Sequence, residues 1–133
     1  MDEKTSDRIS VLLIDDERDY SDTMGFYLKA KGFKVRCADS GRAGLEQIEA
    51  EPPEIVFLDF LMPVMNGVET LRCIRKIAPD LPVVMVTSYA GAEQMEEARS
   101  IGIEDIFAKS EDFSVAARMV RHALSRAVAK KAV

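Results

Sequence analysis

Five polar residues whose types could support chemistry stand at the ends of short apolar runs. They are Asp15 and Asp16 after the first run, Asp59 after the third, Thr87 after the fourth and Lys109 after the fifth. Each has an ordinary explanation alone, because acids often cap helices, hydroxyls are common in turns and an edge lysine is usually solvated. If the runs are parallel strands, however, these residues share the carboxyl edge of the sheet, where such proteins bind ligands. The pattern therefore predicts one polar site.

The three carboxylates predict a metal ion. Asp15, Asp16 and Asp59 cannot all stay ionised cheaply within a few ångströms of one another, so they must share a proton or bind a cation. A hard dication with oxygen ligands fits best, and Mg2+ is the expected ion. Zinc and copper are disfavoured, because the single histidine, His122, lies in the last helical segment.

A magnesium ion beside a carboxylate, a hydroxyl and an ammonium suits phosphoryl transfer to an aspartate. The ion would offset the negative charge of both the nucleophile and the phosphoryl group. Thr87 could then donate a hydrogen bond to one phosphoryl oxygen and Lys109 could pair with another. These residues predict phosphoryl transfer onto an aspartate at this edge.

The elements that must position these residues alternate along the chain. The expected strands are 9–14, 33–37, 55–58, 83–86 and 103–107. The first, third and fourth are continuously apolar, as in strands buried on both faces, whereas the other two carry charges typical of edges. The expected helices are a face from Tyr20 to Leu28 ended by Gly32, 41–50, a segment from Gly67 ended before Pro79, 92–101, and a segment from about Phe113 through Ala127. This alternation predicts an α/β fold with a doubly wound five-stranded parallel sheet, order 2-1-3-4-5, and five helices on both faces.

The composition predicts one domain without a membrane span. The 133 residues are 47% hydrophobic and 31% charged, and the polar start carries no secretory signal, so a cytoplasmic location is expected. A net charge of −5 argues against direct nucleic-acid binding. We expect a flexible segment 1–8, the domain over 9–126, and a helix end or linker stub over 127–133. Cys37 and Cys73 are too far apart in sequence for a metal motif and are expected to be buried small hydrophobic residues.

Nearly the whole chain resembles the receiver domain of two-component response regulators, a flavodoxin-like fold. The matching elements are LLIDDE at 12–17, VFLDFLMP at 56–63, Gly67, VMVTS at 84–88 and Lys109. Spacing, order and strand context agree, so the resemblance is far more specific than a single short motif.

The resemblance implies a role for each matching acidic position. Asp59 would accept a phosphoryl group from a phosphohistidine on a sensor histidine kinase or a phosphotransfer protein. Asp16 would bind Mg2+ directly, Asp15 mainly through water, and the backbone carbonyl of Leu61 would complete the protein ligands. The domain would be no enzyme beyond catalysing its own phosphorylation and a slow autodephosphorylation.

Three departures from the receiver pattern bear on how the signal would leave the site and on how fast the phosphoryl group would be lost. Thr87 and Lys109 match the switch hydroxyl and lysine, but Ile106 stands where many receivers carry an aromatic switch residue. Tyr89 and Phe107 are the candidates to substitute for it, although a packing role is favoured for both. Ser110 replaces the usual proline after the lysine, so the cis bond common there is not expected, because it would cost ~2.5–4 kcal/mol. Neither Leu61 nor Tyr89, which should flank the phosphoryl group, is an acid or amide that positions water, so slow autodephosphorylation is predicted.

The output remains open between two hypotheses. Phosphorylation would shift the population of two conformations, read on the surface formed by the last two helices and the last strand. An effector domain beyond the C-terminus, a downstream protein or a dimer through that surface could read the change. The alternative is a degenerate receiver that acts as a phosphorylation-independent protein-interaction scaffold, which Ser110 and Ile106 leave open.

Overall fold

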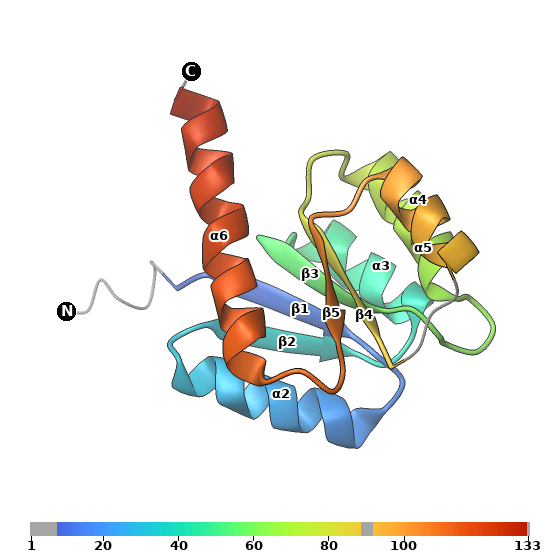
Figure 1. Cartoon of the computed structure of the whole chain (residues 1–133), viewed down its shortest axis with the longest axis horizontal. Coiled ribbons are helices and arrows are strands. Elements are labelled where there is room, and N and C mark those ends of the chain that lie inside the picture. Colours follow the sequence, from blue (N-terminus) through green and yellow to red (C-terminus); the bar gives the residue numbers. More distant parts are fainter. Residues whose placement is uncertain (1–7, 89–91, 133) are drawn as a thin grey trace.

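A computed structural model of the chain describes residues 8–88 and 92–132, with side chains described to residue 127 and from residue 93 after the gap. It shows a five-stranded parallel sheet in the order β2-β1-β3-β4-β5, flanked by helices on both faces (Figure 1). The strands are β1 (Ser10–Ile14), β2 (Lys34–Ala38), β3 (Ile55–Asp59), β4 (Val83–Thr87) and β5 (Asp105–Ala108). The helices are α2 (Arg18–Ala30), α3 (Gly41–Ala50), α4 (Gly67–Ile77), α5 (Ala92–Ile101) and α6 (Phe113–Ala132). The predicted fold class and strand order are confirmed.

Two hydrophobic layers hold the helices on the sheet. One face packs against α3, α4 and α5 through side chains such as Ile48, Leu71 and Ala98. The other packs against α2 and α6 through side chains such as Leu28 and Val120. Every residue of β3 and β4 is buried, whereas β2 and β5 are partly exposed, as their charged sequences predicted.

The register aligns the carboxyl ends of the central strands. Ile14 lies beside both Ala38 and Leu58, and the next residue, Asp15, donates its backbone N–H to the Ala38 carbonyl at 3.0 Å. Asp59 lies beside Val86 in the neighbouring strand. The polar residues that follow these positions therefore meet at one edge, as the sequence predicted.

Local chemistry fixes where the helix next to this edge begins. Asn66 accepts a hydrogen bond from the Glu69 N–H, and the Glu69 carboxylate accepts one from the Asn66 N–H, both at 2.9 Å. This capping box satisfies donors that a helix N-terminus leaves unpaired. Gly67, the first residue of α4, lies so close to the preceding loop that an added Cβ would stand 2.5 Å from the Asp59 carbonyl oxygen. The end of β3 and the start of α4 are therefore packed backbone to backbone.

Several sequence expectations need correction. The fifth strand begins at Asp105, two residues later than predicted, while α6, expected from about Phe113 through Ala127 with 127–133 left open as a helix end or a linker stub, extends to Ala132. In Figure 1 the C-terminal turns of α6 extend beyond the sheet. Cys37 is exposed and Cys73 half-buried, so the prediction that both are buried is wrong. Cys37 lies on the edge strand β2, where no further strand covers it.

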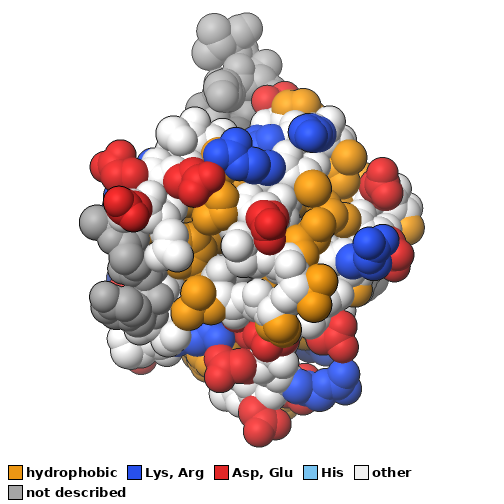
Figure 2. Space-filling model, turned by 90° about the vertical axis from the view of Figure 1, so that its right-hand side faces the viewer, with side chains coloured by type: hydrophobic (Ala, Val, Ile, Leu, Met, Phe, Trp, Pro, Cys, Tyr) orange, Lys and Arg blue, Asp and Glu red, His pale blue; other side chains and the backbone are white. Residues whose placement is uncertain are grey.

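The surface over α4 and α5 carries mixed charges. Figure 2 shows acidic and basic side chains interspersed with hydrophobic ones on this side of the molecule, without a continuous basic field in that view. In the described part of the chain, none of the helices is long and apolar enough to cross a membrane.

Candidate functional site

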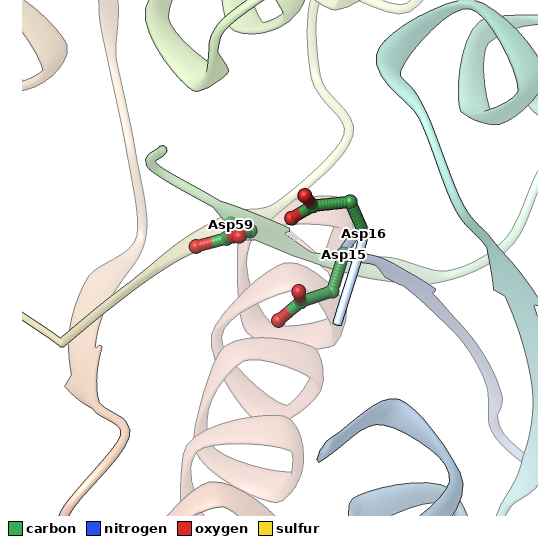
Figure 3. Close-up of side chains that lie close together, drawn as sticks. All are labelled: Asp15, Asp16 and Asp59. Carbon is green, nitrogen blue, oxygen red and sulfur yellow. The ribbon is translucent and has the colours of Figure 1, made fainter. Parts of the chain in front are cut away.

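Three carboxylates meet at the carboxyl edge of the sheet. Asp15 and Asp16 follow β1, and Asp59 is the last residue of β3. One oxygen from each lies within 4.8 Å of the others, and Figure 3 shows the three side chains gathered at this edge. Asp15 and Asp59 are only 5% and 4% exposed, whereas Asp16 is exposed. The predicted convergence of these acids is confirmed.

Burial makes this cluster electrostatically unfavourable unless a cation joins it. Burial and the neighbouring Asp15 carboxylate raise the pKa of Asp59 to about 7, although Lys109 and the Leu61 backbone N–H oppose the shift. A hard divalent cation would relieve the repulsion, and a set of carboxylate oxygens is the donor chemistry that Mg2+ prefers. The residues therefore fit a magnesium ion.

Lys109 directly follows the edge strand β5, and its side chain reaches this cluster at the same carboxyl edge of the sheet. Its Nζ is 2.9 Å from Asp15 Oδ2 and 3.7 Å from Asp59 Oδ2, and it contacts Glu17 Oε1. Burial alone would lower the pKa of Lys109, but hydrogen bonds to Glu17 and Asp15 and the nearby negative charges raise it. The ammonium therefore stays charged beside Asp59.

Thr87 ends β4 next to Lys109. The Lys109 N–H donates to the Thr87 carbonyl at 2.8 Å, which ties β4 to the segment after β5. The Thr87 side chain is 8% exposed, and its Oγ1 has no hydrogen-bond partner among the described residues. A shielded hydroxyl without a partner is unfavourable, and it is available to a ligand that enters the site.

The structure describes some of the remaining predicted site residues but not all of them. Leu61 donates its backbone N–H to the Asp59 carboxylate and leaves its side chain 55% exposed, but metal binding by its carbonyl stays a prediction. Ile106 is half-buried against the core beside Met85. Tyr89 lies outside the described residues. Consistent with Ser110 in place of proline, no cis peptide bond occurs in the described ranges.

Sequence reasoning missed two neighbours of Lys109. Glu17 follows the acidic pair, but its contact with Lys109 joins opposite ends of the chain and depends on both side-chain conformations. Tyr20 was expected only on the apolar face of a helix, yet its ring lies under the Lys109 ammonium, with 4.7 Å between Nζ and the ring centroid. Burial raises the pKa of Tyr20 to about 12, so its hydroxyl stays neutral. The one sequence feature that could have indicated them is their position, because Glu17 and Tyr20 follow Asp16 within four residues.

The doubly wound sheet with an acidic cluster at its carboxyl edge defines a class of signalling domain. Residues 11–121 match the family model of the response regulator receiver domain, and the chain belongs to that family. Receiver domains of two-component systems are signalling domains, and they bind Mg2+ at an acidic pocket of the kind formed here.

Named relatives and solved structures agree with this membership. The chain is 34% identical over 109 residues to the transcriptional regulatory protein ZraR of Escherichia coli K12, covering 82% of this chain but 25% of that protein. It thus spans about a quarter of the length of this relative. A CheY-like receiver domain protein from Methanospirillum hungatei matches with a TM-score of 0.86 and 25% identity, covering 90% of this chain and 95% of that one. The receiver domain of NtrX from Brucella abortus matches with a TM-score of 0.81 and 29% identity, covering 86% and 98%.

Proposed function

We propose that this chain is a phosphoacceptor whose Asp59 takes a phosphoryl group from a phosphohistidine of a sensor histidine kinase or a phosphotransfer protein, with Mg2+ bound. The observation that carries the proposal is the buried Asp59 carboxylate, which lies among Asp15, Asp16 and the Lys109 ammonium. The family membership supports the same function.

The transfer would join an Asp59 oxygen to phosphorus as the phosphorus–nitrogen bond of the donor breaks, and the donor imidazole leaves with the bonding electron pair. A bound magnesium ion would supply positive charge to the carboxylate and the phosphoryl oxygens. Asp16 would hold it directly, Asp15 mainly through water, and the Leu61 carbonyl would complete the protein ligands. Lys109 would pair with one phosphoryl oxygen, and Thr87 would donate its unpartnered hydroxyl to another.

The signal would leave through the surface formed by α5, β5 and α6. Formation of the phosphoryl contacts would favour one of two conformations of this surface. A downstream protein, an effector domain beyond residue 133 or a second copy of the chain would read it. We place this signalling in the cytoplasm. The side chain at Ile106 is aliphatic and packs, half-buried, against the core, so an aromatic swing cannot report the change from that position.

A mass measurement tests the acceptor. The protein is incubated with Mg2+ and a small acyl phosphate, and the phosphoryl adduct is counted by intact mass for wild type and for Asp59→Asn. Asp19→Asn, at an exposed position in the first turn of α2, is the matched control. The proposal expects one phosphoryl group on wild type and on Asp19→Asn, and none on Asp59→Asn.

The other outcomes separate the alternatives. An adduct on Asp59→Asn equal to that on wild type would refute Asp59 as the acceptor. No adduct on any variant, including after incubation with a phosphohistidine donor, would favour the phosphorylation-independent scaffold. The proposal of slow autodephosphorylation rests on the residue types at positions 61 and 89, which the resemblance to receiver domains implies are next to the phosphoryl group and neither of which is an acid or an amide. The double variant Leu61→Asn/Tyr89→Glu is expected to lose the adduct faster than wild type, and an unchanged decay would contradict this reasoning.

A further inference from the structure

Tyr20 forms an aromatic surface beneath the active-site lysine. It lies in the first turn of α2, and its ring centroid is 4.7 Å from Lys109 Nζ. An ammonium at this distance from a ring face is attracted by the negative π-surface, and the attraction grows when water is excluded. Lys109 is only 10% exposed, so the contact is largely desolvated.

The ring is itself held in place. It packs edge-to-face on Phe113 at 5.8 Å between centroids, and Phe113 is the first residue of α6. The Tyr20 hydroxyl is shielded from solvent and has no hydrogen-bond partner among the described residues. The ring, rather than a hydrogen bond of the hydroxyl, is therefore what Tyr20 offers to Lys109.

The Tyr20 ring is important because two carboxylates, Glu17 and Asp59, compete for the Lys109 ammonium. Glu17 contacts Lys109 but is 64% exposed, whereas the Asp59 carboxylate, 3.7 Å from the same ammonium, is buried. A lysine side chain is long and flexible, so an exposed partner can draw its charged end toward water. The attraction between the ammonium and the Tyr20 ring, 4.7 Å from Nζ to the centroid, opposes that displacement.

We propose that Tyr20 is a positioning residue for phosphoryl transfer, whose ring holds the Lys109 ammonium at the depth of Asp59 where it meets the phosphoryl group. This inference rests on the proposed phosphoacceptor function. The ring itself need not touch the phosphoryl group.

Three variants separate the ring from its packing. Tyr20→Leu removes the ring, and Tyr20→Phe restores it without the hydroxyl. Tyr27→Leu is the matched control, because Tyr27 also packs on Phe113 at 5.8 Å, but its ring lies under Lys31 rather than Lys109.

The rate of phosphorylation by a small acyl phosphate at saturating Mg2+ is the first measurement. Tyr20→Leu is expected to be slower than wild type by about tenfold, with Tyr20→Phe restoring most of the rate and Tyr27→Leu leaving it within about twofold. The Mg2+ affinity should stay unchanged, because no carboxylate is removed. An equal loss in Tyr27→Leu would assign the effect to packing on Phe113. An equal loss of rate in Tyr20→Phe would assign the effect to the hydroxyl. A wild-type rate of phosphorylation in Tyr20→Leu would show that the ring has no effect on the reaction. Each of these results overturns the inference.

A second measurement does not depend on phosphorylation. The ε-methylene proton shifts of Lys109 are compared by NMR in the same variants. Loss of the ring current should move these resonances toward unstructured-lysine values in Tyr20→Leu but not in Tyr20→Phe or Tyr27→Leu. If wild type takes no phosphoryl group, the proposed function fails; if the Lys109 shifts are the same in wild type and Tyr20→Leu, the positioning role fails in either case.

Discussion

Replacing Thr87 by valine is expected to stabilise the protein against urea and to slow its phosphorylation. The Thr87 hydroxyl is shielded and unpartnered in the structure. Valine has nearly the same shape and removes only the polar atom. Burying a hydroxyl without a hydrogen bond costs about 1–3 kcal/mol, so the variant should gain about 1 kcal/mol after imperfect repacking. If Thr87 donates to a phosphoryl oxygen, the same change should slow phosphorylation by about tenfold or more.

Thr70 supplies the matched control. It is also buried, at 0% exposed, but its hydroxyl donates to the Asn66 carbonyl at 2.9 Å. Thr70→Val therefore breaks a formed hydrogen bond and should lose about 1 kcal/mol. The same chemical change at two buried threonines is thus expected to shift stability in opposite directions.

Urea unfolding in metal-free buffer, followed by circular dichroism, measures both variants. With a slope of about 1.5 kcal/mol per molar urea, a gain of about 1 kcal/mol moves the midpoint up by about 0.7 M. Thr87→Val should unfold at higher urea than wild type, and Thr70→Val at lower urea. If Thr87→Val unfolds as early as Thr70→Val, the hydroxyl has a partner in solution and the reasoning is refuted.

Three further changes probe the framework and the metal. Gly67→Ala should cost about 1–3 kcal/mol in urea unfolding, because the new Cβ would stand 2.5 Å from the Asp59 carbonyl oxygen; an unchanged midpoint would show that the loop yields freely. Arg75→Met should cost about 2–3 kcal/mol, since the guanidinium donates to the Gly102 carbonyl at 2.9 Å and to other carbonyls nearby, and Arg75→Lys should recover only part. Asp16→Asn should weaken Mg2+ binding by calorimetry about tenfold with little change in unfolding, because Asp16 is exposed; wild-type affinity would remove it from the ligands.

The sequence allowed the fold to be predicted because its strongest signals come from burial. Strands β1, β3 and β4 each carry a run of four apolar residues, at 11–14, 55–58 and 83–86, as expected for strands that are covered on both faces. The acidic cluster was predictable once the strands were known, because the register of parallel strands brings Asp15 and Asp59 to one edge of the sheet. Neither inference needed a side-chain conformation.

The sequence predicted less well where structure depends on an edge or on a rotamer. Cys37 looked like a core residue, but it lies on the edge strand and is exposed. The contacts of Lys109 with Glu17 and Tyr20 join the two ends of the chain, and a four-carbon side chain can reach many partners. Spacing along the chain carries no information about which of them it meets.

The unfavourable features of the site share one property: an incoming charged group would relieve each of them. A bound cation would relieve the repulsion between Asp15 and Asp59, and a phosphoryl oxygen would supply the acceptor that the Thr87 hydroxyl lacks among the described residues. A ligand can shift a conformational equilibrium only through contacts that differ between the two states. A hydroxyl that would gain its acceptor only in the phosphorylated state provides such a difference, and Thr87 is the candidate. The instability that Thr87→Val should remove is therefore the same free energy that would make the protein respond to phosphorylation, and a more stable variant should be a poorer switch.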